Sequence, residues 1–174
     1  VFSTDSRVLE INSKSGLYPL YVAYNIYRSR KEEARQKYGE VNRSFAQSLW
    51  DATIEQNIFV ICKTPMARAI TRRTLVGFRK TRVNAQYYKD LIEVIKNNPA
   101  TFVNEVRDGK RFWKVNNLDH MKFNVIVGNP PYQIMDGGAG ASAIPIYNRF
   151  VEISKLIKPQ YISLIMPARW YAGG

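Results

Sequence analysis

The sequence contains very little cysteine and histidine. Its 174 residues include one cysteine, Cys62, and one histidine, His120. An internal disulfide is therefore excluded, and a single thiol fits a reducing compartment such as the cytosol. A cysteine/histidine zinc site is excluded as well, because such sites draw on several of these residues. No apolar run approaches membrane-spanning length and no signal peptide is recognisable, so we expect neither membrane association nor secretion.

Acidic residues are also scarce relative to basic ones. The chain has 26 Lys+Arg against 14 Asp+Glu, a formal net charge of +12. Such an excess favours a polyanionic partner, and nucleic acid, whose binding weakens with salt, is the expected one. Part of the excess is concentrated in one stretch, at Arg68, Arg72, Arg73, Arg79, Lys80 and Arg82. Contact with DNA phosphates, a solvated face and contact with another domain are all compatible with this basic stretch.

Apolar segments of strand and helix type alternate along the chain. Short β-prone runs predict strands at 7–11, 58–62, 111–115, 123–127 and 161–165. Helices are expected from residue 17, at 45–54, from residue 65, and at 87–96, 101–106 and 144–157. This alternation predicts an α/β fold, with a mostly parallel sheet covered by helices on both faces. A tyrosine stripe at residues 18, 21, 24 and 27 is expected to pack in the core.

The most informative motif follows the strand expected at 123–127. Gly128 ends that strand, and the next four residues are Asn129, Pro130, Pro131 and Tyr132. Two prolines fix φ and remove two N–H donors, so the chain forms a rigid, extended corner. In open α/β sheets ligands bind at this carboxyl edge of the strands. An amide, a free carbonyl and an aromatic ring suit a planar ring that bears an amino group, although a plain proline-rich turn is the alternative.

In this strand context the tetrad resembles the catalytic motif of S-adenosylmethionine-dependent amino-methyltransferases, above all the DNA adenine-N6 enzymes of restriction-modification systems. Residues 121–174 resemble the methylase domain of large single-chain restriction-modification enzymes. The resemblance implies a Rossmann-like fold, S-adenosylmethionine as the cofactor and double-stranded DNA as the substrate. It also implies that the Asn129 side-chain oxygen and the Pro130 carbonyl accept hydrogen bonds from the target amino group. Pro131 would complete the corner, and Tyr132 would stack on the flipped-out base.

The first expected strand leads into a second match. Residues 8–16 align in register with the glycine-rich cofactor loop of that family, with Glu10 at the acidic position and Gly16 as the last glycine. Lys14 stands where a central glycine is usual. A glycine at that position permits close approach of the cofactor. Lys14 could pair with the carboxylate of the cofactor or point to solvent, and an ordinary strand-to-helix turn is also compatible. The cofactor-binding residues implied in this loop are Glu10, Asn12, Ser13 and Gly16.

Two further positions of the family pattern are less clear. The acid that usually holds the ribose at the end of the second strand is not evident, because residues 63–65 are Lys-Thr-Pro. Asp119, after the strand expected at 111–115, is the candidate for contact with the cofactor adenine, and a solvated loop aspartate is the alternative. The glycine-rich loop at 137–142 suits a mobile lid or a plain connection.

These features lead to one expectation and two alternatives. We expect residues 1–174 to be a partial, C-terminally truncated methyltransferase domain without metal, inactive alone. Its parent would be a longer restriction-modification polypeptide in the cytoplasm of a bacterium or archaeon, with target recognition beyond Gly174 and other domains as partners. The first alternative is methylation of protein glutamine or ribosomal RNA. The second is a catalytically inactive nucleic-acid-binding domain, suggested by Lys14 and the missing ribose acid.

Overall fold

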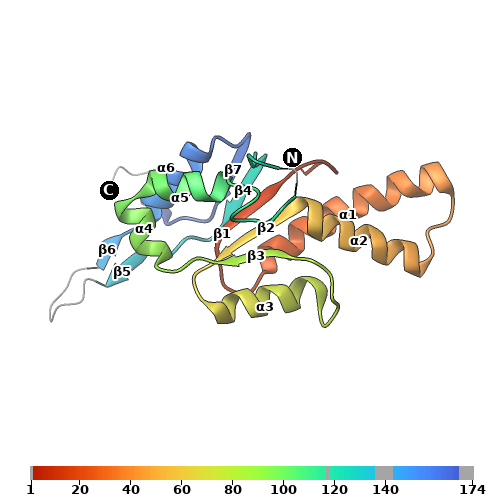
Figure 1. The fold of residues 1–174 in the computed structure, drawn as a ribbon, viewed down its shortest axis with the longest axis horizontal. Coiled ribbons are helices and arrows are strands. Elements are labelled where there is room, and N and C mark those ends of the chain that lie inside the picture. Colours follow the sequence, from red (N-terminus) through yellow and green to blue (C-terminus); the bar gives the residue numbers. More distant parts are fainter. Residues whose placement is uncertain (1, 117, 136–142, 169–174) are drawn as a thin grey trace.

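The protein is built around one parallel sheet. A computed structural model describes residues 2–116, 118–135 and 143–168 (Figure 1). Five strands lie in the order β3-β2-β1-β4-β7, and every neighbouring pair is parallel. Their bounds are Val8–Ser13 for β1, Ile58–Cys62 for β2, Asn84–Tyr87 for β3, Val125–Gly128 for β4 and Tyr161–Leu164 for β7. The predicted α/β fold is confirmed.

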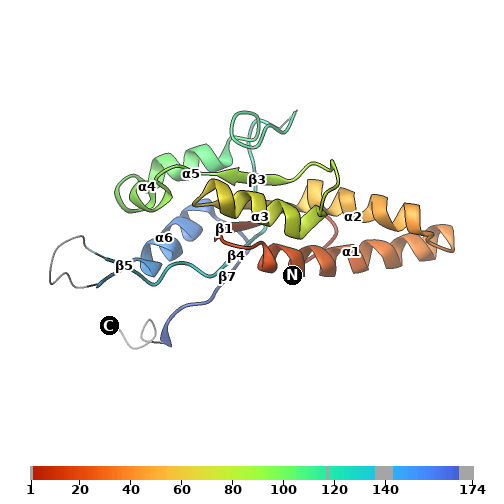
Figure 2. The same cartoon turned by 90° about the horizontal axis from the view of Figure 1, so that it is seen from below.

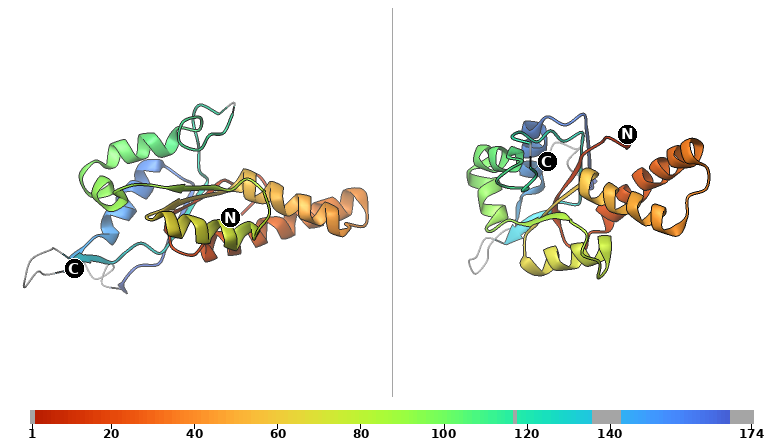
Figure 3. Two further views of the ribbon diagram at one scale, coloured as in Figure 1. Left: turned by 60° about the horizontal axis from the view of Figure 1, so that its bottom comes forward. Right: turned by 45° about the vertical axis from the view of Figure 1, so that its right-hand side comes forward.

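Within the described residues, six helices cover the two faces of the sheet (Figures 1 and 3). The first three are α1 (Leu17–Tyr38), α2 (Arg43–Asn57) and α3 (Pro65–Val76), and the others are α4 (Leu91–Asn97), α5 (Pro99–Arg107) and α6 (Tyr147–Ile157). Alternate residues of β1 face opposite layers. Leu9 packs with the α4–α6 side chains, and Val8 packs with those of α1–α3. This alternation gives the molecule two apolar cores, one on each face of the sheet.

Helix ends are set by local side chains. The Asn42 side chain accepts a hydrogen bond from the Phe45 N–H at 2.9 Å and begins α2. Thr64 does the same for α3, where Pro65 occupies the first turn. Asn and Thr are favoured at such positions because their side chains satisfy N–H groups that the helix leaves unpaired.

The third strand lies elsewhere than predicted. The expectation of a strand at 111–115 is wrong, and β3 (Asn84–Tyr87) holds the third position beside β2. Asn84 anchors this edge strand by donating its side-chain hydrogens to the carbonyls of Glu55 and Ile58. Trp113 lies instead in a loop, with its ring buried on Phe59 and its indole N–H bonded to the Val106 carbonyl at 2.7 Å. The aromatic residues of this β-prone run therefore pack in the core and do not form a strand.

The tyrosine stripe of α1 is mostly exposed. Tyr18, Tyr21 and Tyr24 are 38%, 66% and 52% exposed, so the prediction that they pack in the core is wrong. Three-residue spacing shifts each successive side chain by about 60° around a 3.6-residue helix, so such a stripe cannot stay on one face. The buried face of α1 belongs instead to Val22, Ala23 and Ile26 among others.

Two hairpins extend from opposite ends of the molecule (Figures 1 and 2). The helical hairpin of α1 and α2 projects beyond the sheet, because α1 stays helical to Tyr38 through a charged stretch of the chain. At the other end, β5 (Gln133–Met135) pairs with β6 (Ala143–Pro145) in an antiparallel ladder. The lid expected at 137–142 lies outside the described residues. Within the described ranges, no helix combines the length and apolarity that crossing a bilayer requires.

Candidate functional site

The proline corner follows the strand that lies between β1 and β7. The Gly128 carbonyl accepts a hydrogen bond from the Ile165 N–H at 3.0 Å, and the Tyr132 carbonyl accepts one from the Ile146 N–H at 3.1 Å. Pro130, between them, is buried. The corner is thus held at one end by the continuation of β7 and at the other by the residue before α6, which adds to the stiffness of its prolines.

Two groups of the corner remain accessible. Asn129 is exposed, and its amide makes no hydrogen bond within the part of the chain that the structure describes. The Tyr132 ring is 40% exposed. An unpartnered amide and an accessible ring on a rigid backbone leave both groups available to a ligand.

The loop after β1 has an unusual backbone. Asn12 has a positive φ of 71° at an irregularity in the pairing of β1 with β2, and Gly16 has a φ of 76°. A Cβ on Gly16 would lie 3.0 Å from the Thr71 backbone, so this position needs glycine for its conformation and for its packing. The Gly16 N–H donates to the Ser13 hydroxyl at 3.1 Å and closes the loop. Lys14 points outward as an exposed side chain, so it does not fill the interior of the loop.

Glu10 places a carboxyl group in the sheet just before this loop. It is 4% exposed, and its Oε2 atom has no hydrogen-bond partner. Burial raises its pKa from 4.5 to about 7, although a hydrogen bond with Ser13 opposes the rise. Glu10 lies opposite Val127 in the register of β1 and β4, one residue before Gly128. A buried, unpaired carboxylate oxygen is costly, and a ligand that supplies an N–H or a positive charge would relieve that cost.

A hollow lies between the β1 loop and the end of β4, and its lining reaches Gly128, the residue before the corner. Its volume is about 660 Å³, and its lining includes Ser15, Leu17 and Tyr18 from the loop and α1, together with Val127, Gly128 and Ser163 from the strands. The hollow therefore ends directly before the corner, beside the turn at 15–16.

A second hollow, of about 560 Å³, lies across the carboxyl ends of β2 and β3. Lys63 and Tyr87 line it from the two strand ends, Asp90 and Glu93 line it from the start of α4, and Gln133 follows the proline corner. Sequence reasoning missed Asp90, because it depended on the strand expected at 111–115. The available signal was an aspartate directly before the helical run Leu-Ile-Glu-Val-Ile. Asp90 has a φ of 52°, a conformation that aspartate tolerates better than most residues.

Asp119 does not lie at the carboxyl end of a sheet strand. Its side chain is 83% exposed and pairs with the Lys110 ammonium at 2.5 Å. Asp119 is a candidate only if the third strand lies at 111–115. Because β3 lies at Asn84–Tyr87 instead, the reason for choosing Asp119 no longer holds. At the end of β2, Lys63 and Thr64 are exposed and Thr64 caps α3, so no acid follows β2 directly. Within the described ranges, no group of three or more His, Cys, Asp or Glu side chains could hold a metal ion.

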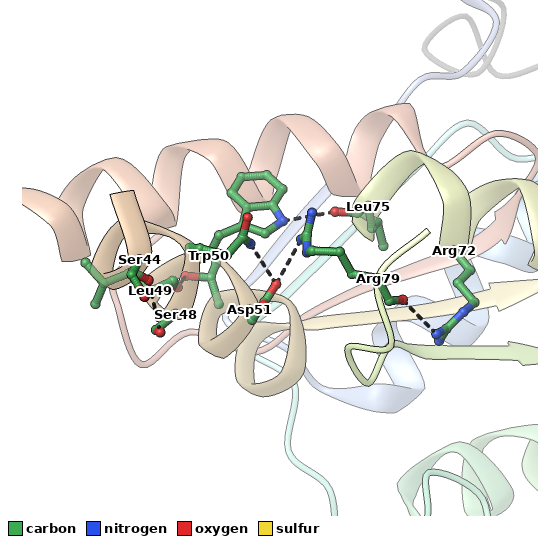
Figure 4. Close-up of polar contacts among 10 residues, drawn as sticks. Ser44, Ser48, Leu49, Trp50, Asp51, Arg72, Leu75 and Arg79 are labelled. Carbon is green, nitrogen blue, oxygen red and sulfur yellow. Dashed lines mark hydrogen bonds and ion pairs between the residues drawn. The ribbon is translucent and has the colours of Figure 1, made fainter. Parts of the chain in front are cut away.

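The basic stretch at 68–82 is partly structural. The Arg68 guanidinium donates to the Ala85 carbonyl at 2.8 Å, and Arg82 donates to the carbonyls of Trp113 and Lys114. Arg79 pairs with Asp51 at 2.9 Å and accepts a bond from Arg72 at its carbonyl (Figure 4). These side chains tie α3 and the following loop to neighbouring elements, so only a part of the stretch is free to meet a partner.

The strand order, the parallel register and the proline corner define a Rossmann-like α/β fold of the methyltransferase kind. A family model described as the Eco57I restriction-modification methylase matches residues 56–174, and the chain belongs to this family. The chain is also similar to an uncharacterized adenine-specific methylase of Mycoplasma pneumoniae (strain ATCC 29342 / M129 / Subtype 1). The two are 33% identical over 95 residues, which cover 53% of this chain and 22% of that relative.

Proposed function

We propose that the chain is the catalytic part of a DNA adenine-N6 methyltransferase that uses S-adenosylmethionine. Membership of the restriction-modification methylase family and the adenine-specific relative support the reaction class. The observation that carries the proposal is the unpartnered, exposed Asn129 amide on a clamped proline corner, which begins directly after Gly128, a lining residue of the hollow beside the β1 loop.

The residues of the corner have distinct roles in this proposal. The Asn129 side-chain oxygen and the Pro130 carbonyl accept hydrogen bonds from the adenine amino group and direct its lone pair. Pro131 keeps the backbone extended, and Tyr132 stacks on the base once it has left the duplex. These contacts contribute by orientation and by acceptors aimed at the nitrogen as positive charge develops on it.

The residues at the other strand ends fit the cofactor. S-adenosylmethionine supplies an electrophilic methyl group when it is bound. The unpaired Oε2 of Glu10 is suited to the amino group of its methionine part, with Asn12, Ser13 and Gly16 shaping the loop. The N-terminus of the 22-residue helix α1 favours a carboxylate. Asp90 and Glu93 offer acceptors to the ribose hydroxyls and the adenine amino group, so Asp90 replaces Asp119 in the proposed set.

Replacing Asn129 tests the proposal. In the full-length protein, Asn129→Ala should lower kcat by at least about 100-fold, the loss typical when one aligned hydrogen-bonding group is removed from a transition state. Binding to duplex DNA should change less than about twofold, because phosphate contacts dominate affinity. Asn104→Ala, an exposed site on α5, is the control and should retain wild-type turnover. Wild-type turnover of Asn129→Ala would refute the assigned role.

The alternatives are separated by substrate. The full-length protein should transfer labelled methyl groups to duplex DNA, and labelling confined to ribosomal RNA or release factor would favour the first alternative. Failure to bind S-adenosylmethionine in calorimetry would favour an inactive domain. The exposed position of Lys14 speaks against that outcome, because its side chain does not occupy the interior of the loop.

We also propose that the domain acts within a longer restriction-modification polypeptide in a prokaryotic cytoplasm, which the much longer relative supports.

A further inference from the structure

A groove on the α1–α3 side of the sheet is not used by the proposed reaction. It lies between α1, α2 and the end of α3, and has a volume of about 610 Å³. We call it the aromatic–arginine groove, and its defining residues are Tyr24, Tyr27, Arg43, Trp50, Arg73 and Arg79. Its lining contains no acidic side chain. The groove is therefore a concave surface of one charge sign with aromatic walls.

Cations lie against rings in and around this groove. The Arg73 guanidinium is 3.9 Å from the centre of the Phe78 ring, and Phe78 is 88% exposed. Arg28 lies over the ring of Tyr24 at 5.9 Å. A guanidinium that stacks on an exposed aromatic ring interacts favourably with the face of the ring. The N–H groups at the edge of the guanidinium remain free to donate hydrogen bonds. These pairs present both an apolar surface and hydrogen-bond donors.

The walls of the groove are fixed by side-chain bonds (Figure 4). The Trp50 indole N–H donates to the Leu75 carbonyl at 2.9 Å and joins α2 to the end of α3. Arg79 pairs with Asp51 at 2.9 Å, and Gln47 donates to the same carboxylate at 3.1 Å. Arg43 is exposed and has no partner among the described residues. Arg73 donates one N–H to the Gly77 carbonyl at 3.3 Å. The frame is thus satisfied internally, whereas Arg43 and the other guanidinium donors of Arg73 are left for an anion.

We propose that the aromatic–arginine groove binds the sugar–phosphate backbone of duplex DNA that flanks the methylation target; this rests on the proposed function. Guanidinium groups pair with phosphate oxygens, and contacts of this kind position a duplex without reading its sequence. The net charge of +12 makes a polyanion the matching partner. An acidic protein segment would satisfy the same cations but would be much less densely charged than DNA.

The length of α1 is consistent with one duplex reaching both places. The helix begins next to Gly16 in the β1 loop, and Tyr24 lies eight residues further along. At 1.5 Å per residue, Tyr24 and Tyr27, the groove residues on α1, lie about 12 and about 17 Å along the helix from that loop. With one base pair every 3.4 Å, the groove would face DNA roughly four to five base pairs from the target.

Duplex length supplies the test. The methylated site is first mapped in DNA treated with the full-length enzyme. Two duplexes then carry that site; one ends at its borders, and the other continues for about fifteen base pairs on each side. The groove variant is R43E/R73E, and the control R111E/K122E makes the same charge change at exposed residues elsewhere. We expect the groove variant to bind the long duplex at least about tenfold more weakly, with a salt slope reduced by about 2.

The short duplex shows whether the effect belongs to the groove. The groove variant should bind and methylate it like the wild type and like the control. Equal losses on both duplexes, an equal loss in the control, or no loss at all would overturn the inference. The inference would also be overturned if the groove variant kept wild-type affinity for DNA but lost a protein that remains bound to the wild type. That result would favour an acidic protein partner. If R43E/R73E does not fold, R43Q/R73Q should show a smaller loss with the same dependence on length. Absence of methylation by the wild type on every duplex would instead contradict the proposed function.

Discussion

Glu10 combines a structural cost with a proposed role in cofactor binding. Its carboxyl group is 4% exposed in the centre of the sheet, and one oxygen lacks a partner. A residue chosen only for stability at this place would be apolar, like Val8 and Val60 nearby on the same face. A buried polar atom without a partner is the kind of local conflict that proteins retain at functional sites.

The ionisation of Glu10 should make stability depend on pH. Below pH 4.5 the group is protonated in both the folded and the unfolded chain, and between 4.5 and about 7 the unfolded chain ionises first. The free energy of unfolding therefore falls across this window, by about 3 kcal/mol in total, and levels off above pH 7. Glu10→Gln removes this ionisation. In urea titrations of the cofactor-free full-length protein, the variant should gain up to about that amount at pH 8 and almost nothing at pH 4. An equal gain at both pH values would mean that packing, and not ionisation, is responsible.

Local backbone constraints decide which site residues can be found from sequence. The corner at Asn129 follows from two prolines, and Gly16 follows from a turn that needs positive φ. Asp90 could not be found in the same way, because its position next to the proposed cofactor site depends on which segment forms the third strand. The exposure of Tyr18, Tyr21 and Tyr24 was also missed, since three-residue spacing was taken for a single face.

At the scale of elements, the buried strands and the edge strand β7 were predictable, and the other edge strand, β3, was not. β2 was predicted with the bounds that it has, and β4 lies within two residues of its expected bounds, because buried parallel strands are continuous apolar runs. β3 reads Asn-Ala-Gln-Tyr and lacks that pattern, since it lies at the edge of the sheet and is held by the side chain of Asn84. The run at 111–115 has strand-like composition, but its aromatic rings fill the core under β2.

The contact between α5 and α6 offers a prediction at this scale. The Arg107 guanidinium, in the last turn of α5, donates to the carbonyls of Leu156 and Ile157 at 2.9 and 3.0 Å and so satisfies the end of α6. Arg107→Met keeps much of the apolar stem and removes both bonds. It should lower the free energy of unfolding by about 1–3 kcal/mol in urea titration.

Arg111→Met provides the matched control. Arg111 is 92% exposed, and its carboxylate partner Asp108 is 3.8 Å away, so its loss should change stability by less than about 0.5 kcal/mol. Equal losses for the two variants would show that the α6 carbonyls gain nothing from Arg107.

For the whole molecule, the proposed cofactor site joins loops that follow β1, β2, β3 and β4. A ligand that binds there only in the folded state stabilises it by mass action, by about 2.7 kcal/mol at a concentration of 100 Kd. S-adenosylmethionine should therefore raise the Tm of the full-length protein, while the same concentration of ATP should not. No change in Tm, with DNA binding retained, would favour the inactive alternative.

The order of the strands has a consequence of its own. From β1 the chain moves outward to β2 and β3, and from β4 it moves outward to β7 in the other direction. The helices that follow β1 and β4 pass to opposite sides, so neither connection crosses the space between these two neighbours. A crevice there is a product of connectivity rather than of any single side chain. The crevice should survive substitutions that repack either core. Such substitutions should change its rigidity more than its position.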